Sequence, residues 1–297
     1  MVVLVIKNFE LRIMKSNIQI SLYSLLLVLG SFLTACEVIP GGERDKIIFT
    51  PSDPNAVKRT SLLIEYSGWK CTNCPTAAEE AHHLKEQYGE NLVVVVMHPE
   101  TNPNTKYTNN KGKVDESVKR YICPEADSIY LMMGGTRETN FPTGNINMVK
   151  DDTDGYFKKW EDWATLVSQA YSDPKPILLS NEAYCIDTNV IFVTTDITNL
   201  DTKAIEATVQ IWLTEDSIIG KQEGAPDPKN YVHNHLMRAS ISPIWGEKLP
   251  IDAHMTQQMV YEYTLPENVK KENCNIVSIV SINGEVVQAC ENKITLE

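Results

Sequence analysis

Hydrophobic residues in the first half of this chain form short continuous runs typical of buried strands. Between these runs lie stretches with the composition and spacing of helices. Ser61–Tyr66 and Asn91–Met97 are apolar runs with the length and β-branched content of buried strands. Between them, Thr76–Tyr88 has a helix-forming composition and ends at Gly89, a residue type that commonly stops helices. The order strand, helix, strand is typical of an α/β domain.

Helical stretches continue after this unit. A polar segment is followed by helical stretches at Asp115–Tyr121 and Ala126–Met133, so residues 100–138 form a helical insertion. Gly155–Ala170 has tryptophan and leucine at helical spacing and predicts a closing helix. We therefore place an α/β domain over residues 58–175.

The pattern changes after Pro174-Lys175-Pro176, where closely spaced prolines interrupt helices and stiffen a linker. Asn283-Gly284 is a strong two-residue hairpin turn that sends Glu285–Ala289 back along the preceding strand. Short β-branched and aromatic runs with few helical signals predict an all-β antiparallel sandwich over residues 176–297. The predicted strands are Val190–Thr195, Ala204–Leu213, Val260–Leu265 and Ile276–Ile282.

The N-terminal part carries an apolar run of another kind. Lys15 precedes the apolar stretch Leu22–Leu33, which closes on the letters LTAC at Cys36. A basic start, a short apolar core and small residues at a cut site are the features of a secretory signal. The core of about a dozen residues is too short for a membrane span, which needs about 20. Because it ends on a cysteine, the segment 1–36 resembles the bacterial lipoprotein signal, with a start at Met14 or upstream of it.

That resemblance implies that Cys36 is acylated and becomes the mature N-terminus, with membrane lipid as its partner. Several acyl chains hold a protein to a membrane almost permanently, because each buried methylene contributes about 0.8 kcal/mol. Residues 37–57 contain Gly-Gly and three prolines, which indicates a flexible tether between the lipid and the folded part.

Composition restricts the partners of the folded part. The chain is 42% hydrophobic and 22% charged, which is ordinary for a globular protein. Its net charge is −12, and the residues before Cys36 contribute +2 (Lys7, Arg12 and Lys15 against Glu10), so the remainder carries −14. Phosphate backbones repel such an acidic surface, so we expect no nucleic-acid partner.

The cysteines point to an oxidising compartment. Of seven cysteines, six remain when Cys36 is set aside, and an even count in an exported chain favours disulfides. Cys71 and Cys74 form a CxxC at the predicted helix start, where the helix dipole stabilises a thiolate. By this logic Cys71 attacks a disulfide and Cys74 resolves the mixed disulfide.

A metal site is the alternative use of these residues. Zinc needs further ligands at matched spacing, and the chain has no second CxxC. His233-Asn234-His235 places two imidazoles on one face of a strand, which could hold a metal, but cross-strand polar residues near a loop explain the pattern more simply. We therefore predict neither a metal nor a cofactor.

The segment around the CxxC resembles the thioredoxin superfamily. Glu65 stands six residues before Cys71, where the resemblance implies a buried acid that helps to deprotonate Cys74. Pro142, in the sequence NFPT, matches the loop where that fold places a cis-proline against the CxxC. The resemblance thus implies a thioredoxin-like α/β domain with a site made of Cys71, Cys74, Glu65 and Pro142.

The pairing of the later cysteines depends on the hairpin turn. A two-residue turn at Asn283-Gly284 places Cys290 opposite Val277 and Cys274 opposite Lys293, with the two thiols on different sides of the sheet. We therefore predict that Cys274 and Cys290 are not bonded to each other. A three-residue turn would bring them onto one face.

Taken together, the lipoprotein signal, the tether, EYSGWKCTNCP, FPTG and HNHLMR resemble the 28-kilodalton outer-membrane lipoprotein family of Bacteroidales. The resemblance implies an outer-membrane lipid anchor and leaves open whether the protein faces the periplasm or the cell surface. Two functions remain open. One is a thiol–disulfide oxidoreductase acting on exported proteins, which exposure of Cys71 would favour. The other is a non-catalytic binding, adhesion or structural lipoprotein with the CxxC held as a disulfide, which burial of Cys71 beneath the insertion would favour.

Overall fold

The computed structural model describes residues 57–108, 111–153, 155–185 and 189–296, which belong to one compact unit. The predicted signal, its Cys36 and nearly all of the predicted tether lie outside the described residues. Within the described ranges, no helix combines the length and the hydrophobicity that crossing a membrane requires.

The helices are short, and the longest begins at the CxxC. It starts at Cys74 rather than Thr76 because Pro75 fits the first helical turn, where its missing N–H leaves no bond unmade. The α-helices among the described residues are α2 (Cys74–Tyr88), α3 (Glu116–Lys119), α4 (Pro124–Met132) and α5 (Trp163–Tyr171). Short 3-10 turns occur at η2 (Gly89–Asn91), η3 (Pro103–Thr105), η4 (Trp160–Asp162) and η5 (Lys271–Asn273). The predicted central helix and insertion helices are thus confirmed, and the closing helix is present but begins at Trp163 instead of Gly155.

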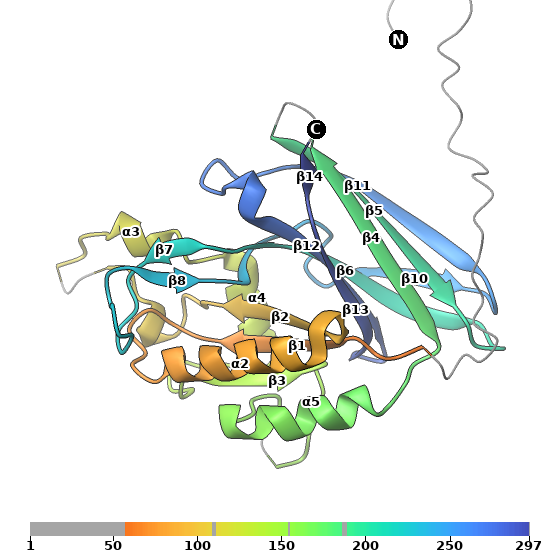
Figure 1. The fold of residues 1–297 in the computed structure, drawn as a ribbon, viewed down its shortest axis with the longest axis horizontal. Coiled ribbons are helices and arrows are strands. Elements are labelled where there is room, and N and C mark those ends of the chain that lie inside the picture. The colour runs from red at the N-terminus through yellow and green to blue at the C-terminus, as the bar shows by residue number, and fades with distance from the viewer. Residues whose placement is uncertain (1–56, 109–110, 154, 186–188, 297) are drawn as a thin grey trace, which may run out of the picture. The chain divides into compact units, whose positions relative to one another are not determined.

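Strands predominate and form one large sheet and two smaller ones (Figure 1). The large sheet has the order β13-β12-β6-β9-β2-β1-β3, and β10 also pairs with β6. Its strands are β1 (Ser61–Tyr66), β2 (Leu92–Met97), β3 (Thr143–Ile146), β6 (Ile205–Glu215), β9 (Leu236–Ser240), β10 (Glu247–Ile251), β12 (Cys274–Ile282) and β13 (Glu285–Lys293). The second sheet has the order β11-β5-β4-β14, and β7 pairs with β8. These strands are β4 (Ile177–Cys185), β5 (Val190–Asn199), β7 (Ile218–Gly220), β8 (Tyr231–His233), β11 (Thr256–Thr264) and β14 (Thr295–Leu296).

The predicted fold class, a thioredoxin-like α/β domain followed by an all-β antiparallel sandwich, is wrong. Strands from both halves of the chain join in one mixed sheet, because β2 pairs in parallel with β9 at Val96 and Leu236. The Val96 N–H donates to the His235 carbonyl oxygen at 2.8 Å at this junction. The first-half strands therefore extend the sheet of the second half instead of forming a separate α/β core.

A shared hydrophobic core accompanies the shared sheet. Fully buried side chains of β1, such as Leu62 and Tyr66, belong to the same cluster as Trp212 of β6 and Val286 of β13. Helix α4 packs on this side, whereas α2 and α5 cover the opposite face of β1 and β2 through a second cluster that includes Trp163. The sheet β11-β5-β4-β14 packs on β6 and β12 through a third cluster.

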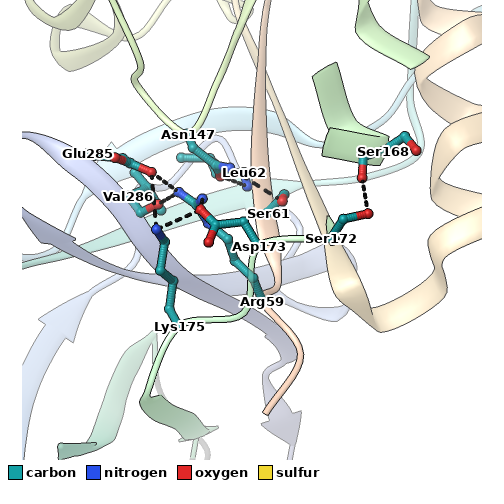
Figure 2. Close-up of polar contacts among 10 residues, drawn as sticks. All are labelled: Arg59, Ser61, Leu62, Asn147, Ser168, Ser172, Asp173, Lys175, Glu285 and Val286. Atoms are coloured by element: carbon teal, nitrogen blue, oxygen red, sulfur yellow. Dashed lines mark hydrogen bonds and ion pairs between the residues drawn. The ribbon is translucent and has the colours of Figure 1, made fainter. Parts of the chain in front are cut away.

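A buried cation adds a polar connection between the two halves (Figure 2). Arg59, which precedes β1 and is 2% exposed, donates to the Val286 carbonyl oxygen and lies 2.7 Å from Glu285 Oε1. It also pairs with Asp173, which lies between α5 and β4 and is bound by Lys175 at 2.7 Å. Arg59 therefore holds the start of β1 against the β12–β13 hairpin.

The hairpin confirms the turn at Asn283-Gly284 but not the predicted register beyond it. Ile282 pairs with Glu285 as expected, and a bulge after Val280 then shifts the pairing by one residue, so that Cys290 faces Ser278. Cys274 thus shares a face with Cys290 but lies four positions away, roughly 14 Å along the strand. The prediction that the two are not bonded is confirmed, although the reason is distance and not opposite faces.

Candidate functional site

The CxxC forms a disulfide at the N-terminus of α2. Cys71 and Cys74 are bonded to each other, and Cys74 is the first residue of the helix. The loop before them is held in place by the backbone, since the Cys71 N–H donates to the Gly68 carbonyl oxygen at 2.9 Å. Of the later cysteines, Cys123, Cys274 and Cys290 carry free thiols, so the even cysteine count did not predict a full set of disulfides.

A segment from the second half of the chain covers this disulfide. In the loop between β7 and β8, Gln222 Nε2 donates to the carbonyl oxygens of Cys71 (2.9 Å) and Gly68 (3.2 Å). The Glu223 N–H donates to the Trp69 carbonyl oxygen at 2.7 Å. Under this cover the exposed fraction of Cys71 is 5% and that of Cys74 is 1%.

The predicted insertion contributes less to the cover than expected. Asn104 accepts a hydrogen bond from the Lys70 N–H at 3.0 Å, and a Cβ at Gly68 would lie 2.8 Å from the Asn104 backbone. The insertion therefore supports the CxxC loop from one side. The loop between β7 and β8 approaches the CxxC loop more closely than the insertion does. A Cβ added at Gly224 in that loop would lie only 2.0 Å from the Thr72 carbonyl oxygen.

Glu65 lies beside the disulfide in a cavity of about 200 Å³. The cavity lies between α2 and the β7–β8 hairpin, over the ends of β1 and β2, and its lining includes Glu65, Cys74, His98, His233 and His235. Glu65 and Cys74, both proposed from the sequence, are thus brought together. Two histidine positions noted in the sequence join them, together with His98, which sequence reasoning missed.

Burial controls the charge of the groups in the cavity. It raises the pKa of Glu65 to about 7, against the opposing effects of a hydrogen bond from Ser67 and the nearby charge of His235. Burial also lowers the pKa of His233 to about 4 and that of His98 well below its usual value, with the charge of His233 adding to the effect on His98. At neutral pH the imidazoles of His98 and His233 are therefore uncharged.

His235 is the exception, because it has acidic partners. Burial alone would lower its pKa, but Glu291 and Asp216, at 3.7 and 3.5 Å from His235 Nδ1, raise it. Burial would likewise raise the pKa of Glu291, but His235 and Lys85, whose Nζ lies 3.1 Å from Glu291, lower it. His235 has a positive φ of 57°, so it does not continue the β8 strand. The predicted placement of His233 and His235 on one strand face is therefore wrong.

Pro142 precedes the strand that pairs with β1. The Phe141–Pro142 bond is cis, and Pro142 directly precedes β3, whose Thr143 pairs with Tyr66 at the end of β1. Pro142 is not among the residues that line the cavity. Cys36, the predicted lipidation site, lies outside the described residues. In the part of the chain that the structure describes, no group of three or more His, Cys, Asp or Glu side chains has the arrangement of a metal site.

Known proteins resemble this chain mainly through its second half and its overall fold. The model of the family "Outer membrane protein Omp28" matches residues 136–296, which is more than half of the chain. HBP35 of Porphyromonas gingivalis superposes with a TM-score of 0.62 at 17% identity, over 81% of this chain and 76% of that one, and thus shares the fold.

Two further structures align less closely. A domain of the outer membrane lipoprotein Omp28 from Porphyromonas gingivalis is 25% identical over 41% of this chain and 89% of its own, with a TM-score of 0.31. Protein AGR_C_4864 from Agrobacterium tumefaciens is 12% identical over 80% of this chain and 95% of its own, with a TM-score of 0.45. No curated protein sequence matches the chain.

Proposed function

Because this chain belongs to the Omp28 outer membrane protein family, we propose that it is an outer-membrane lipoprotein anchored through acylated Cys36, with a folded body that binds or supports rather than catalyses. In this proposal the CxxC is a structural disulfide that fixes the start of α2. The body is a non-catalytic binding, adhesion or structural module of the cell envelope.

The observation that carries the proposal is the burial of both sulfur-bearing residues. Thiol–disulfide exchange needs a thiolate to reach a sulfur atom of the disulfide, so access controls its rate. Cys71, the residue that would exchange first, is only 5% exposed beneath Gln222 and Glu223. Reactive cysteines are at least partly exposed, whereas buried structural ones are inert.

A thiol–disulfide oxidoreductase is the second candidate, and one observation favours it. Glu65, with a pKa raised to about 7, lines the same cavity as Cys74 and could accept its proton. That reaction starts from the dithiol form, which an external thiol reductant must first generate from the disulfide. The Cys71 thiolate then attacks a substrate disulfide and releases one substrate thiolate. The Cys74 thiolate then attacks Cys71 in the mixed disulfide, which re-forms Cys71–Cys74 and releases the second substrate thiolate. This reaction requires the segment Gln222–Gly224 to move away from Cys71.

Replacing Gly224 by alanine tests whether the cover limits access. Gly224 has φ +83°, and its new Cβ would collide with the Thr72 carbonyl oxygen at 2.0 Å, so the covering segment must shift away from the CxxC loop. We expect dithiothreitol to reduce Cys71–Cys74 at least tenfold faster in this variant. The rate is measured by quenching with N-ethylmaleimide and mapping the peptides that contain Cys71 and Cys74.

Gly134→Ala is the matched control. Gly134 has nearly the same φ, +84°, but a Cβ there would meet no atom within 4 Å, so this variant carries the backbone strain without the collision. Its reduction rate should stay within about twofold of the wild type. If Gly224→Ala is reduced no faster than Gly134→Ala, the segment does not protect the disulfide and the proposal loses its basis.

A further inference from the structure

The cavity beside the disulfide contains buried polar atoms that the protein leaves unpaired. Glu65 Oε2 and both ring nitrogens of His98 have no hydrogen-bond partner among the described residues. Both residues are 1% exposed, and both line the cavity. An unpaired buried polar atom costs about 1–3 kcal/mol, and more for a charged group, so an occupant that pairs with these atoms would be stabilised.

The cavity has walls of several kinds. One side is the face of α2 that carries Cys74, Ala78 and Ala81, and the opposite side is the β8 region from Tyr231 to His235. The rings of His98 and His233 lie 5.7 Å apart in an edge-to-face arrangement. An apolar and aromatic wall facing a few polar groups is typical of a small-molecule site.

The charge around the cavity favours a cation. Because the imidazoles of His98 and His233 are uncharged, Glu65 is the group inside the cavity that can carry a negative charge. Glu79 and His82 also line the cavity, on the side formed by α2. In the lining outside α2, the cationic group is His235, which is already paired with Asp216 and Glu291. Lys85, which does not line the cavity, pairs with the same Glu291.

The volume limits the size of the occupant. About 200 Å³ corresponds to roughly six or seven water-sized groups, since each water occupies about 30 Å³ of liquid. A cavity of this volume can hold a short organic cation but is too small for an extended peptide. An ammonium group presents three N–H donors, which complement the carboxylate of Glu65 and the acceptor nitrogen of a neutral imidazole.

We propose that this cavity binds a small organic cation with a primary ammonium group, with Glu65 as its counter-ion and His98 as a second acceptor. The inference deepens the proposed function, on which it rests, because it gives the non-catalytic body a class of ligand. Thiol chemistry and ammonium binding are measured separately, so either can fail without the other.

The charge of Glu65 should make the binding of an ammonium ion depend on pH. Its pKa is raised to about 7, so the carboxylate is mostly protonated at pH 6 and mostly charged at pH 8. Binding of an ammonium should therefore strengthen several-fold between pH 6 and pH 8. The acidic partners of His235 raise its pKa, so loss of its positive charge at higher pH would act in the same direction.

Titration with n-butylammonium chloride tests the proposal, with butan-1-ol as a neutral probe of similar shape and butyrate as an anionic one. In two-dimensional amide NMR of the body at pH 8, butylammonium should give saturable shifts at Val96, His98 and His235. Butan-1-ol should bind at least tenfold more weakly, and butyrate should give no saturable shift.

Glu65→Gln removes the charge while keeping the shape, and it should weaken butylammonium binding at least tenfold at pH 8. Its pH dependence should shrink to the smaller part that His235 contributes. Glu90→Gln, at an exposed glutamate outside the cavity lining, makes the same change of net charge and should leave binding unchanged. If Glu65→Gln does not fold, the comparison of the three probes on the wild type decides the question alone. Absence of saturable shifts, equal binding of butylammonium and butan-1-ol, or equal binding to wild type and a folded Glu65→Gln would overturn the proposal.

Discussion

Replacing Trp212 by alanine is expected to lower the free energy of unfolding by about 3–5 kcal/mol, the range for removing a buried tryptophan from a core. Trp212 lies on β6 in the second half of the chain and is fully buried. Its cluster also contains Leu62 and Tyr66 of β1, so the loss should destabilise both halves together. Chemical denaturation followed by tryptophan fluorescence and by circular dichroism should show a single transition, shifted as a whole.

Trp245→Ala is the control for this experiment, because Trp245 is 54% exposed and its loss should change stability by no more than about 0.5 kcal/mol. Two separate transitions, of which Trp212→Ala moves only one, would contradict the shared core. That result would mean that the strands before β4 fold independently of those after it.

Replacing Cys36 by alanine is expected to release the protein from the membrane almost completely. Each methylene of an acyl chain contributes about 0.8 kcal/mol to membrane binding, so loss of the lipid anchor removes far more energy than any single contact in the body. The motivation is the sequence signal that ends at Cys36, which lies outside the described residues. Fractionation of cells that express the variant should move the protein from the membrane to the soluble fraction.

Labelling with an alkyne analogue of palmitate and mass spectrometry of the mature N-terminal peptide provide the direct readout. Wild type should carry acyl chains on an N-terminal Cys36, and Cys290→Ser, which changes a thiol of the folded body, should be labelled equally. An unmodified Cys36, or a mature N-terminus at another residue, would show the lipoprotein interpretation to be wrong.

Local structure was predictable wherever a short stretch of sequence determines it. Helix α2 follows from its composition and from Pro75, and the β12–β13 turn follows from Asn283-Gly284, because glycine and asparagine tolerate the positive φ values that the turn needs. The burial of Glu65 was also expected, and Glu65 lines the same cavity as Cys74, while its role toward that thiol stays a prediction.

The joining of the two halves was not predictable, because the contacts that determine it lie between residues far apart in the sequence. A single pair, Val96 with Leu236, connects β2 to β9, and the two residues are far apart in the chain. No local pattern indicates such a pairing, and the prolines near residue 175 favour a boundary between independent folds. The valine-rich run of β2 is equally suited to a separate parallel sheet and to the mixed sheet that forms.

The covering of the CxxC by the loop between β7 and β8 could not be predicted from the sequence for a similar reason. Gln222 and Gly224 lie in a polar loop whose sequence shows only turn signals, and their role depends on contacts with residues about 150 positions earlier. His98 could have been noticed, because it directly follows the buried run of β2, which pairs with β1, the strand that carries Glu65. The bulge after Val280 left no clear signal, and it changed which residue faces Cys290.

We infer that the Cys71–Cys74 disulfide does not turn over in the native protein. The most direct measurement is the rate at which the folded body accelerates the reduction of insulin disulfides by dithiothreitol, compared with Cys71→Ser. We expect equal rates for the two proteins, both close to the rate without protein. A wild-type rate at least tenfold above that of Cys71→Ser would show that the disulfide turns over and would identify the protein as a thiol–disulfide oxidoreductase.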